Sequence, residues 1–227
     1  MYIDFHTHKP IFTSDSNVLE IISCHVHRKF DGFLFTVGHH PWWTDGLLNI
    51  DDLENLRRLL ADSQCIGLGE CGLDKLKGAN KEIQEAVFLQ QIELANQQNV
   101  PLIVHCVRQY DQVIRFKKKY GNTPWVIHGF RRNEILAKSL INEGIKLSIS
   151  PFEGMNDSFV TMLKSLPNDA YFIETDSDYS LTIIERYALM ASIKHLSIAD
   201  LQEQMEENFK QFFKERHLQL SNFQNRL

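Results

Sequence analysis

Eight short apolar runs, separated along most of the chain by amphipathic helical patterns, constrain the fold of this 227-residue sequence more than any other feature. The runs are residues 2–5, 18–23, 32–37, 66–69, 102–104, 125–127, 145–148 and 171–173. Several are continuously apolar, which is typical of strands buried on both faces of a parallel sheet. Because strands that alternate with helices form a parallel sheet, eight such repeats predict a (β/α)8 TIM barrel of the α/β class.

The first connection of this barrel is irregular. About a dozen residues separate the first two predicted strands, which is too few for a helical crossover. The prediction is therefore a distorted TIM barrel with a trimmed first crossover. The sequence contains no repeat, low-complexity tract or Pro/Gly-rich linker, so residues 1–227 are predicted to form a single domain.

Helical patterns fill most of the later intervals. Residues 82–98 carry apolar side chains at helical spacing, and shorter helices are predicted over residues 111–120, 133–143 and 157–166. Asp51 or Asp52 is predicted to cap an earlier helix, and Ser197 to begin the last one.

Composition narrows the classes of function. No apolar run approaches the roughly 18 residues of a membrane span, and no signal peptide is apparent, so we expect a cytoplasmic protein with reduced cysteines. The net charge of −5 argues against broad, nonspecific nucleic-acid binding. It leaves a phosphodiester substrate open, because bound divalent ions add positive charge. The basic run of residues 117–119 is expected at a helix end, where it suits the helix dipole.

Potential metal ligands recur where the predicted strands end, beginning with two histidines separated by one residue. Side chains at positions i and i+2 of a strand point to the same side, and barrel active sites lie at the carboxyl ends of the strands. The candidates are His6, His8, His40, Glu70, His105, His128 and Asp176. Imidazole and carboxylate ligands suit zinc, manganese or similar ions. Six or seven ligands indicate two ions, with a carboxylate as the natural bridge.

Each histidine also has a structural interpretation, as a buried, hydrogen-bonded residue. The coincidence of six placements favours the metal site over that alternative. His40 has an alternative in the neighbouring His39, and the two histidines could instead line a pocket. Cys24, His25 and His27 resemble a metal cluster, but they precede a basic, loop-like stretch and are assigned no function.

Six motifs resemble, in order, the signatures of the TatD family of metal-dependent DNases. They are DFHTH (4–8), GHHP (38–41), GECGLD (69–74), VHC (104–106), IHGF (127–130) and ETDS (174–177). The resemblance covers nearly the whole chain. It implies a distorted TIM barrel with two, sometimes three, divalent ions (Zn, Mn or Mg). Members of this family are hydrolases, and many cleave DNA phosphodiesters, often as 3′-to-5′ exonucleases.

The resemblance also implies roles for individual residues. His6, His8 and Asp176 would hold the first ion, with Glu70 as the bridge. His105 and His128 would complete the second site. His40 would lie near the scissile phosphate or at a third ion, and Asp176 would act as general base or orient the attacking water. Asp176, Glu70 and His40 are thus the predicted catalytic residues.

Three departures from the family pattern affect loops rather than ligands. Asp178 stands where the family has proline, and the segment that commonly follows is missing. Val107 stands where Arg is common, with Arg108 next, and Arg131-Arg132 replaces small residues.

Substrate contacts are predicted at positions beside the ligands. Arg108, Arg131 or Arg132 could grip a phosphate, or could be ordinary surface charges. Trp42 could stack on a base, although it or Trp43 could instead close the barrel mouth.

The sequence therefore predicts a metal-dependent hydrolase that cleaves DNA ends or small phosphodiesters with water activated by two metal ions. The alternative is an amidohydrolase acting on a small ester or amide. Many such barrels use a carboxylated lysine as the bridging ligand, and Glu70 at that position favours the first reading. A non-catalytic scaffold is a third class, disfavoured by the intact ligand set. No membrane association or obligate protein partner is predicted.

Overall fold

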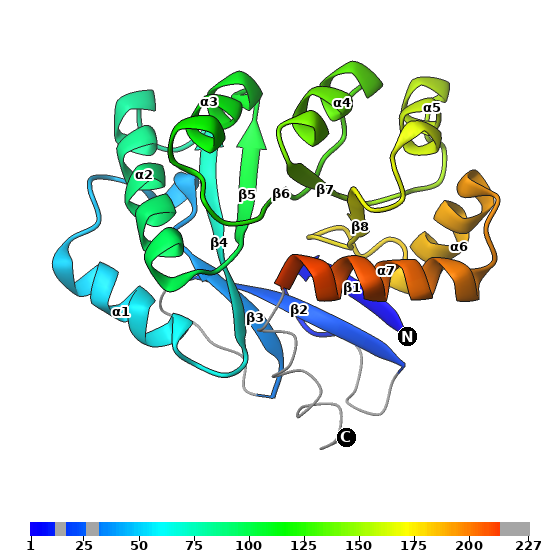
Figure 1. Ribbon diagram of the computed structural model, residues 1–227, viewed down its shortest axis with the longest axis horizontal. Coiled ribbons are helices and arrows are strands. Elements are labelled where there is room, and N and C mark those ends of the chain that lie inside the picture. The colour runs from blue at the N-terminus through cyan, green and yellow to red at the C-terminus, as the bar shows by residue number, and fades with distance from the viewer. Residues whose placement is uncertain (12–16, 26–31, 214–227) are drawn as a thin grey trace. The chain divides into compact units, whose positions relative to one another are not determined.

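The computed structural model describes residues 1–11, 17–25 and 32–213 (Figure 1). The chain divides into two compact units, which we name by their place in the sequence. The terminal unit comprises Met1–Ile21 and His128–Leu227, and the central unit comprises Ile22–Ile127. β2 (Val18–His25) spans the boundary in the sequence. The single domain expected from the sequence remains a prediction.

The central unit is built on parallel strands that follow one another in chain order. Its further strands are β3 (Leu34–Gly38), β4 (Cys65–Asp74), β5 (Leu102–Val107) and β6 (Trp125–Ile127). Its helices are the 3₁₀ turn η1 (Pro41–Trp43), α1 (Ile50–Leu60), α2 (Lys81–Gln98) and α3 (Tyr110–Tyr120). Figure 1 shows α2 and α3 beside β4 and β5, which they contact.

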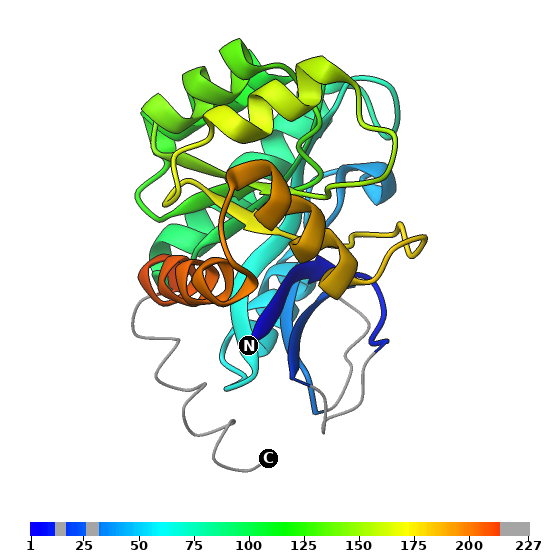
Figure 2. The same ribbon diagram turned by 90° about the vertical axis from the view of Figure 1, so that its right-hand side faces the viewer.

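The terminal unit joins the beginning of the chain to its last third. Its strands are β1 (Tyr2–Thr7), β7 (Ile145–Ile149) and β8 (Tyr171–Ile173). Its helices are α4 (Glu134–Asn142), α5 (Asp157–Ser165), α6 (Ile183–Lys194) and α7 (Ile198–Phe213). β7 pairs with β8 in parallel, and a parallel bridge joins Thr7 to Asp176. Figure 2 shows α6 and α7 beside β1, which both helices contact.

Polar side chains fix where the helices begin. Asn49 caps α1 by accepting from the Asp52 N–H, and the Asp52 side chain accepts from the Asn49 N–H in return. The prediction that Asp51 or Asp52 caps this helix was therefore wrong, because Asp52 is the reciprocal partner in the capping box. Asparagine also caps α2, α4 and α5.

Two site-bearing strands are longer than their apolar runs predicted. β4 continues to Asp74 although residues 70–74 include charged side chains and glycine, and every residue of the strand is buried. β5 continues to Val107. Glu70 and His105 therefore lie within strands, not at strand ends as expected. At Gly72 (φ +139°) a Cβ atom would lie 2.1 Å from the His105 carbonyl oxygen, so only glycine permits this close approach of β4 to β5.

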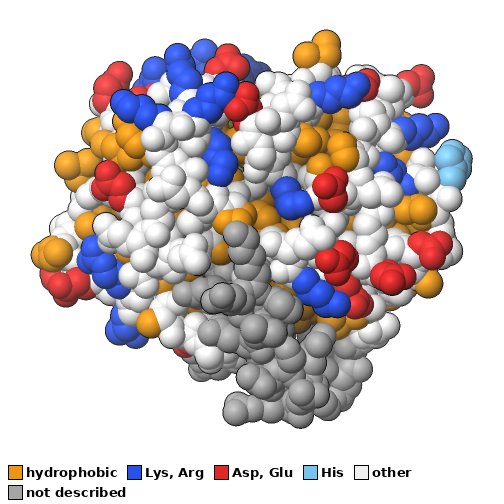
Figure 3. Space-filling view, in the orientation of Figure 1, with side chains coloured by type: hydrophobic (Ala, Val, Ile, Leu, Met, Phe, Trp, Pro, Cys, Tyr) orange, Lys and Arg blue, Asp and Glu red, His pale blue; other side chains and the backbone are white. Residues whose placement is uncertain are grey.

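The trimmed first crossover was predicted between β1 and β2, and residues 12–16 of that connection lie outside the described residues. The basic run of residues 117–119 forms the last turn of α3. Figure 3 shows Lys and Arg side chains gathered over that part of the surface. Within the described ranges, no helix is both long and apolar enough to cross a membrane.

A buried tyrosine on α6 connects that helix to β1. The Tyr187 hydroxyl accepts from the Ile3 N–H (3.0 Å) and donates to the Ile3 carbonyl (3.1 Å). Because Tyr187→Phe leaves both buried backbone groups without this partner, we expect the free energy of unfolding to fall by about 1–3 kcal/mol in urea denaturation. Tyr120→Phe, at a half-buried position on α3, should change it by less than about 0.5 kcal/mol. An equal loss in both variants would contradict this role of Tyr187.

Candidate metal centre

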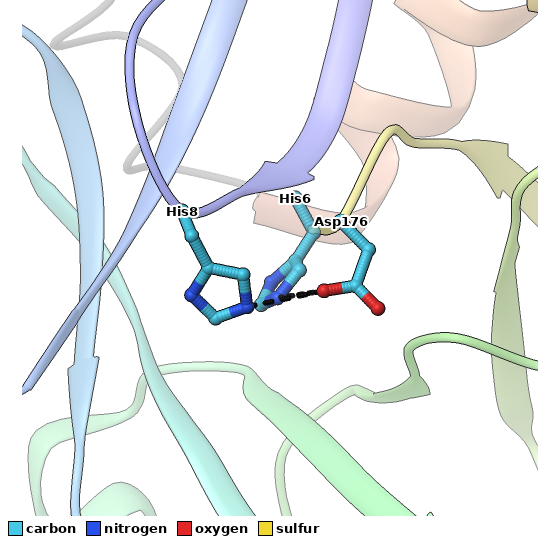
Figure 4. A group of neighbouring side chains, drawn as sticks. All are labelled: His6, His8 and Asp176. Atoms are coloured by element: carbon cyan, nitrogen blue, oxygen red, sulfur yellow. Dashed lines mark hydrogen bonds and ion pairs between the residues drawn. The ribbon is translucent and has the colours of Figure 1, made fainter. Parts of the chain in front are cut away.

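The terminal unit brings together three of the predicted ligands. His6 lies on β1, His8 directly follows that strand, and Asp176 follows β8. The His8 Nε2 atom lies 3.0 Å from Asp176 Oδ1, and His6 Nε2 lies 4.0 Å from the same oxygen. Each residue offers one ligand atom, and the three atoms lie within 4.8 Å of one another. Figure 4 shows the three side chains pointing toward one another. We call this set the terminal group.

Backbone pairing positions these ligands. The Asp176 N–H donates to the His6 carbonyl (2.9 Å), and Asp176 adopts a left-handed conformation (φ 55°) that turns the chain after β8. The preceding residue is held by Asp4, whose carboxyl group accepts from the Thr175 N–H (2.9 Å) and hydroxyl (2.6 Å). Asp176 is thus fixed to β1 by its own backbone and by that of its neighbour.

Two buried acids next to the terminal group were not assigned a role from the sequence. Burial raises the pKa of Asp4 to about 8. Burial also raises the pKa of Glu174, and the imidazoles of His128 and His6 partly offset that effect. Glu174 Oε1 accepts from the Gly129 N–H at 2.5 Å, which fixes the backbone beside His128. Each acid lies two residues before a predicted ligand, and this spacing was the signal that could have identified them.

His128 lies in the terminal unit against His6. Their rings stack with centroids 4.3 Å apart and an interplanar angle of 27°. The His128 side chain is buried. The structure therefore brings His128 to the imidazole of His6.

The central unit brings together a second set, His40, Glu70 and His105, which we call the central group. Their ligand atoms also lie within 4.8 Å of one another. The His40 Nε2 atom lies 3.9 Å from Glu70 Oε1, and the His40 and His105 ring centroids are 4.3 Å apart. The Ser23 hydroxyl donates to Glu70 Oε2 at 3.2 Å. Sequence reasoning placed His40 near the substrate or a third ion, and the structure puts it beside Glu70 and His105.

The neighbouring histidines take other positions. The Gln91 side chain binds the backbone N–H and carbonyl of His39 (2.8 and 3.0 Å). Of the two histidines, His40 is the one that belongs to a group of potential metal ligands. His25 packs against the His39 and Trp43 rings. In the part of the chain that the structure describes, no potential metal-binding group includes Cys24 or His25. His27 lies outside the described residues.

Asp74 is the main residue of the central site that sequence reasoning missed. Its Oδ2 atom accepts from Trp42 Nε1 (2.6 Å) and lies 3.1 Å from His105 Nε2. Its Oδ1 atom accepts from the Leu76 and Lys77 N–H groups (2.7 and 3.1 Å). Burial alone would raise the pKa of Asp74, but the hydrogen bonds from Trp42, His105 and Leu76 outweigh burial and lower it. A histidine that binds a metal through one ring nitrogen commonly donates a hydrogen bond to a carboxylate through the other. Asp74 is placed to be that carboxylate for His105.

The predicted substrate-binding residues lie at the surface. Arg108 is exposed and directly follows β5 in a left-handed conformation (φ 54°). Arg131, in the terminal unit, is exposed and stacks its guanidinium 3.6 Å above the Phe152 ring. Trp42 is 40% exposed. Their contacts with a substrate remain predictions.

Both groups have the chemistry of a divalent metal site. Each combines two imidazoles with one carboxylate, and each places its potential ligand atoms within 4.8 Å of one another. This donor set suits zinc and manganese. The residues present therefore fit a divalent ion in each group.

A protein-family comparison decides the family. The model of a family described as "TatD related DNase" matches residues 12–214, which is most of the chain. The chain belongs to the TatD-related DNase family.

Curated relatives carry the same family name. The chain is 28% identical over 172 residues to a TATDN1 homolog from Vairimorpha ceranae, covering 75% of this chain and 61% of the relative. It is 28% identical over 186 residues to the "3'-5' ssDNA/RNA exonuclease TatD" of Cronobacter sakazakii, covering 75% and 67%. The chain spans 58–61% of the length of the first TATDN1 homologs that it matches.

A solved structure of a TatD homolog shows the fold. YJJV from Escherichia coli K12 superposes with a TM-score of 0.76 at 18% identity, covering 93% of this chain and 97% of that one. Eight parallel strands with helices between them match a TIM barrel. The predicted fold class is confirmed.

The loop after β4 packs directly on η1, and Gly78 permits this contact. Gly78 has φ +92°, and a Cβ atom there would lie 2.1 Å from the Pro41 carbonyl oxygen. Because Gly78→Ala combines backbone strain with this clash, it should lower the free energy of unfolding by about 1–3 kcal/mol in urea denaturation. Gly46→Ala, where a Cβ would meet nothing within 4 Å, is the matched control. Equal stability of the two variants would show that the loop does not need this close approach.

Proposed function

We propose that the chain is a divalent metal-dependent hydrolase that cleaves phosphodiester bonds of DNA. The observation that carries the proposal is the presence of two imidazole–carboxylate groups, the terminal and central groups, in a TatD-related DNase. The name of the Cronobacter sakazakii relative supports a nucleic-acid substrate. The net charge of −5 requires that any attraction for a phosphodiester be local to the site.

We propose that each group holds one divalent ion, with Zn, Mn and Mg as the candidates. When bound, such ions polarise phosphate oxygens and make water a nucleophile at neutral pH. His6, His8 and Asp176 would hold one ion, and Glu70, His105 and His40 would hold the other. His128, packed on His6, is proposed as a further ligand or as support for that ring.

Three side chains are proposed to act in catalysis. Asp176, whose Oδ1 atom is 3.0 Å from His8, would orient the attacking water and accept its proton. Glu70 would hold the ion through the oxygen nearer His40, because the Ser23 hydroxyl donates to its other oxygen and fixes the side chain. His40, whose Nδ1 atom accepts from the Trp42 N–H (3.1 Å), would present its other ring nitrogen to the ion, next to the reacting phosphate. Arg108, Arg131 and Trp42 are proposed to contact the rest of the substrate.

The rival function is that of an amidohydrolase acting on a small ester or amide. Glu70 stands where many such enzymes carry a carboxylated lysine, and the family match favours a nuclease. Substrate preference separates the two proposals, because both use metal-activated water.

Metal content is the first test. Purified protein should bind about two equivalents of divalent metal by elemental analysis, and chelation should abolish hydrolysis of a chromogenic phosphodiester. Glu70→Gln should lower the metal content and reduce kcat/KM by at least on the order of 100-fold. Loss of a residue that only hydrogen-bonds to a metal ligand already costs up to about 100-fold, and Glu70 is proposed to bind the ion directly. Glu82→Gln makes the same chemical change on the exposed surface of α2 and should leave both measurements unaltered. Full activity of Glu70→Gln would refute the proposed metal mechanism.

Substrate class is the second test. Initial rates should be compared on single-stranded DNA, duplex DNA, a small phosphodiester and a panel of small esters and amides, each with Mg, Mn and Zn. Because the proposed groups are matched to phosphate oxygens, we expect cleavage of DNA and of the small phosphodiester. Turnover of an ester or amide without cleavage of any DNA would favour the amidohydrolase instead.

A further inference from the structure

Next to the central group, the ammonium of Lys77 lies over the face of the Trp42 indole. The Lys77 ammonium lies 3.6 Å from the centroid of a Trp42 ring. The Trp42 side chain in turn meets His40 edge-on (centroids 4.8 Å apart) and His105 (5.6 Å). The lysine, the indole and two candidate ligands thus form a continuous chain of contacts within the central unit.

The position of this indole is determined by several contacts. The Trp42 Nε1–H donates to the carboxylate of Asp74, which also lies within hydrogen-bond distance of His105. The Trp42 backbone N–H donates to His40. The other oxygen of Asp74 accepts from the Lys77 N–H. One carboxylate therefore ties together the indole, the loop that carries the lysine and a candidate metal ligand.

The loop itself is held from beneath by a buried glutamine on α2. The Gln84 side chain accepts from the Asp74 N–H (2.8 Å) and donates to the carbonyls of Asp74, Lys77 and Ala79 (3.0, 3.1 and 2.7 Å). These four bonds span the loop, and Gly78 lets it lie directly on η1. The ammonium group is consequently presented from a well-supported backbone.

The charge of Lys77 has no acidic partner in the described part of the chain. Lys77 is exposed and its side chain makes the contact with Trp42 but no ion pair. An ammonium that lies on an aromatic face keeps its hydrogen-bond donors available for an anion. On a chain whose net charge is −5, such a cation beside the candidate metal ligands is suited to an anionic substrate.

We propose that Lys77, steadied by Trp42, binds a phosphate of the nucleic-acid strand other than the one being cleaved. The inference rests on the proposed function and deepens it, because it makes an oligonucleotide the preferred substrate over a diester with a single phosphate. The central group would engage the scissile phosphate, while the indole sets the distance from that group to the ammonium.

The test compares three variants on two substrates. Lys77→Ala removes the charge, Lys77→Arg keeps it, and Lys75→Ala removes a charge from an exposed position in the same loop. Steady-state kinetics would be measured on a short single-stranded oligonucleotide and on a chromogenic diester. Binding of the labelled oligonucleotide to the metal-chelated protein would be followed by fluorescence anisotropy at several salt concentrations.

Lys77→Ala should lower kcat/KM for the oligonucleotide about 10-fold more than for the small diester, the size of one lost charge-assisted hydrogen bond. The salt slope of oligonucleotide binding should become shallower by about 0.7, as expected for one lost contact to single-stranded phosphate. Lys77→Arg should retain most of the preference. Lys75→Ala should change the ratio of the two kcat/KM values by less than about 2-fold.

Three results would overturn the inference. The first is that Lys77→Ala and Lys75→Ala change the ratio of the two kcat/KM values equally. The second is that Lys77→Ala lowers kcat/KM equally for the oligonucleotide and the small diester. The third is that Lys77→Ala leaves the salt slope of oligonucleotide binding unchanged. In each case cleavage of DNA by the wild-type protein would leave the proposed function standing. A wild-type protein that neither binds nor cleaves the oligonucleotide would instead refute both proposals.

Discussion

The candidate site depends on how its buried carboxylates are satisfied. A carboxylate removed from water is costly unless several donors surround it. Asp74 meets this condition with bonds from an indole, an imidazole and two backbone N–H groups. Asp4 has fewer donors, the backbone N–H and hydroxyl of Thr175, and burial raises its pKa to about 8. In satisfying these acids the chain also fixes the groups that donate to them. Asp74 thereby positions His105, and Asp4 positions the residue that precedes Asp176.

The same requirement explains what the sequence could and could not predict. The repeated strand–helix pattern predicted the barrel, and the recurring His, Glu and Asp residues predicted that His6, His8 and Asp176 would lie together. The membership of His40 in the central group, with Glu70 and His105, was not predicted. The apolar-run criterion failed at β4 and β5, because the polar residues Glu70, which is buried, and His105, which is half-buried, lie within strands. Hydrophobic periodicity underestimates a strand wherever a site replaces apolar residues with ligands. The role of Asp74 was missed for a related reason, since it depends on the approach of Trp42 and His105 from other elements.

The sequence also could not show which of the adjacent histidines, His39 or His40, is a candidate metal ligand. Gln91 binds both backbone polar groups of His39, and the first turn of η1 places the Trp42 N–H on His40 Nδ1. A motif with two adjacent histidines does not encode these contacts with α2 and η1. In the structure His40 belongs to the same group as Glu70 and His105, which makes it part of the proposed ion site.

The departure from the family pattern at Asp178 has a structural counterpart. Where the family has proline, the Asp178 N–H donates to the Thr175 carbonyl, closing the turn that contains Asp176. The fully buried Arg186 guanidinium donates to the Asp178 carbonyl (2.5 Å) and the Pro151 carbonyl (2.8 Å), and lies 3.4 Å from the Asp178 carboxylate. A proline would restrict this turn through its ring, but it has no N–H to donate. Here the turn is instead held by a buried cation from α6, so the catalytic candidate Asp176 keeps a defined position without the proline.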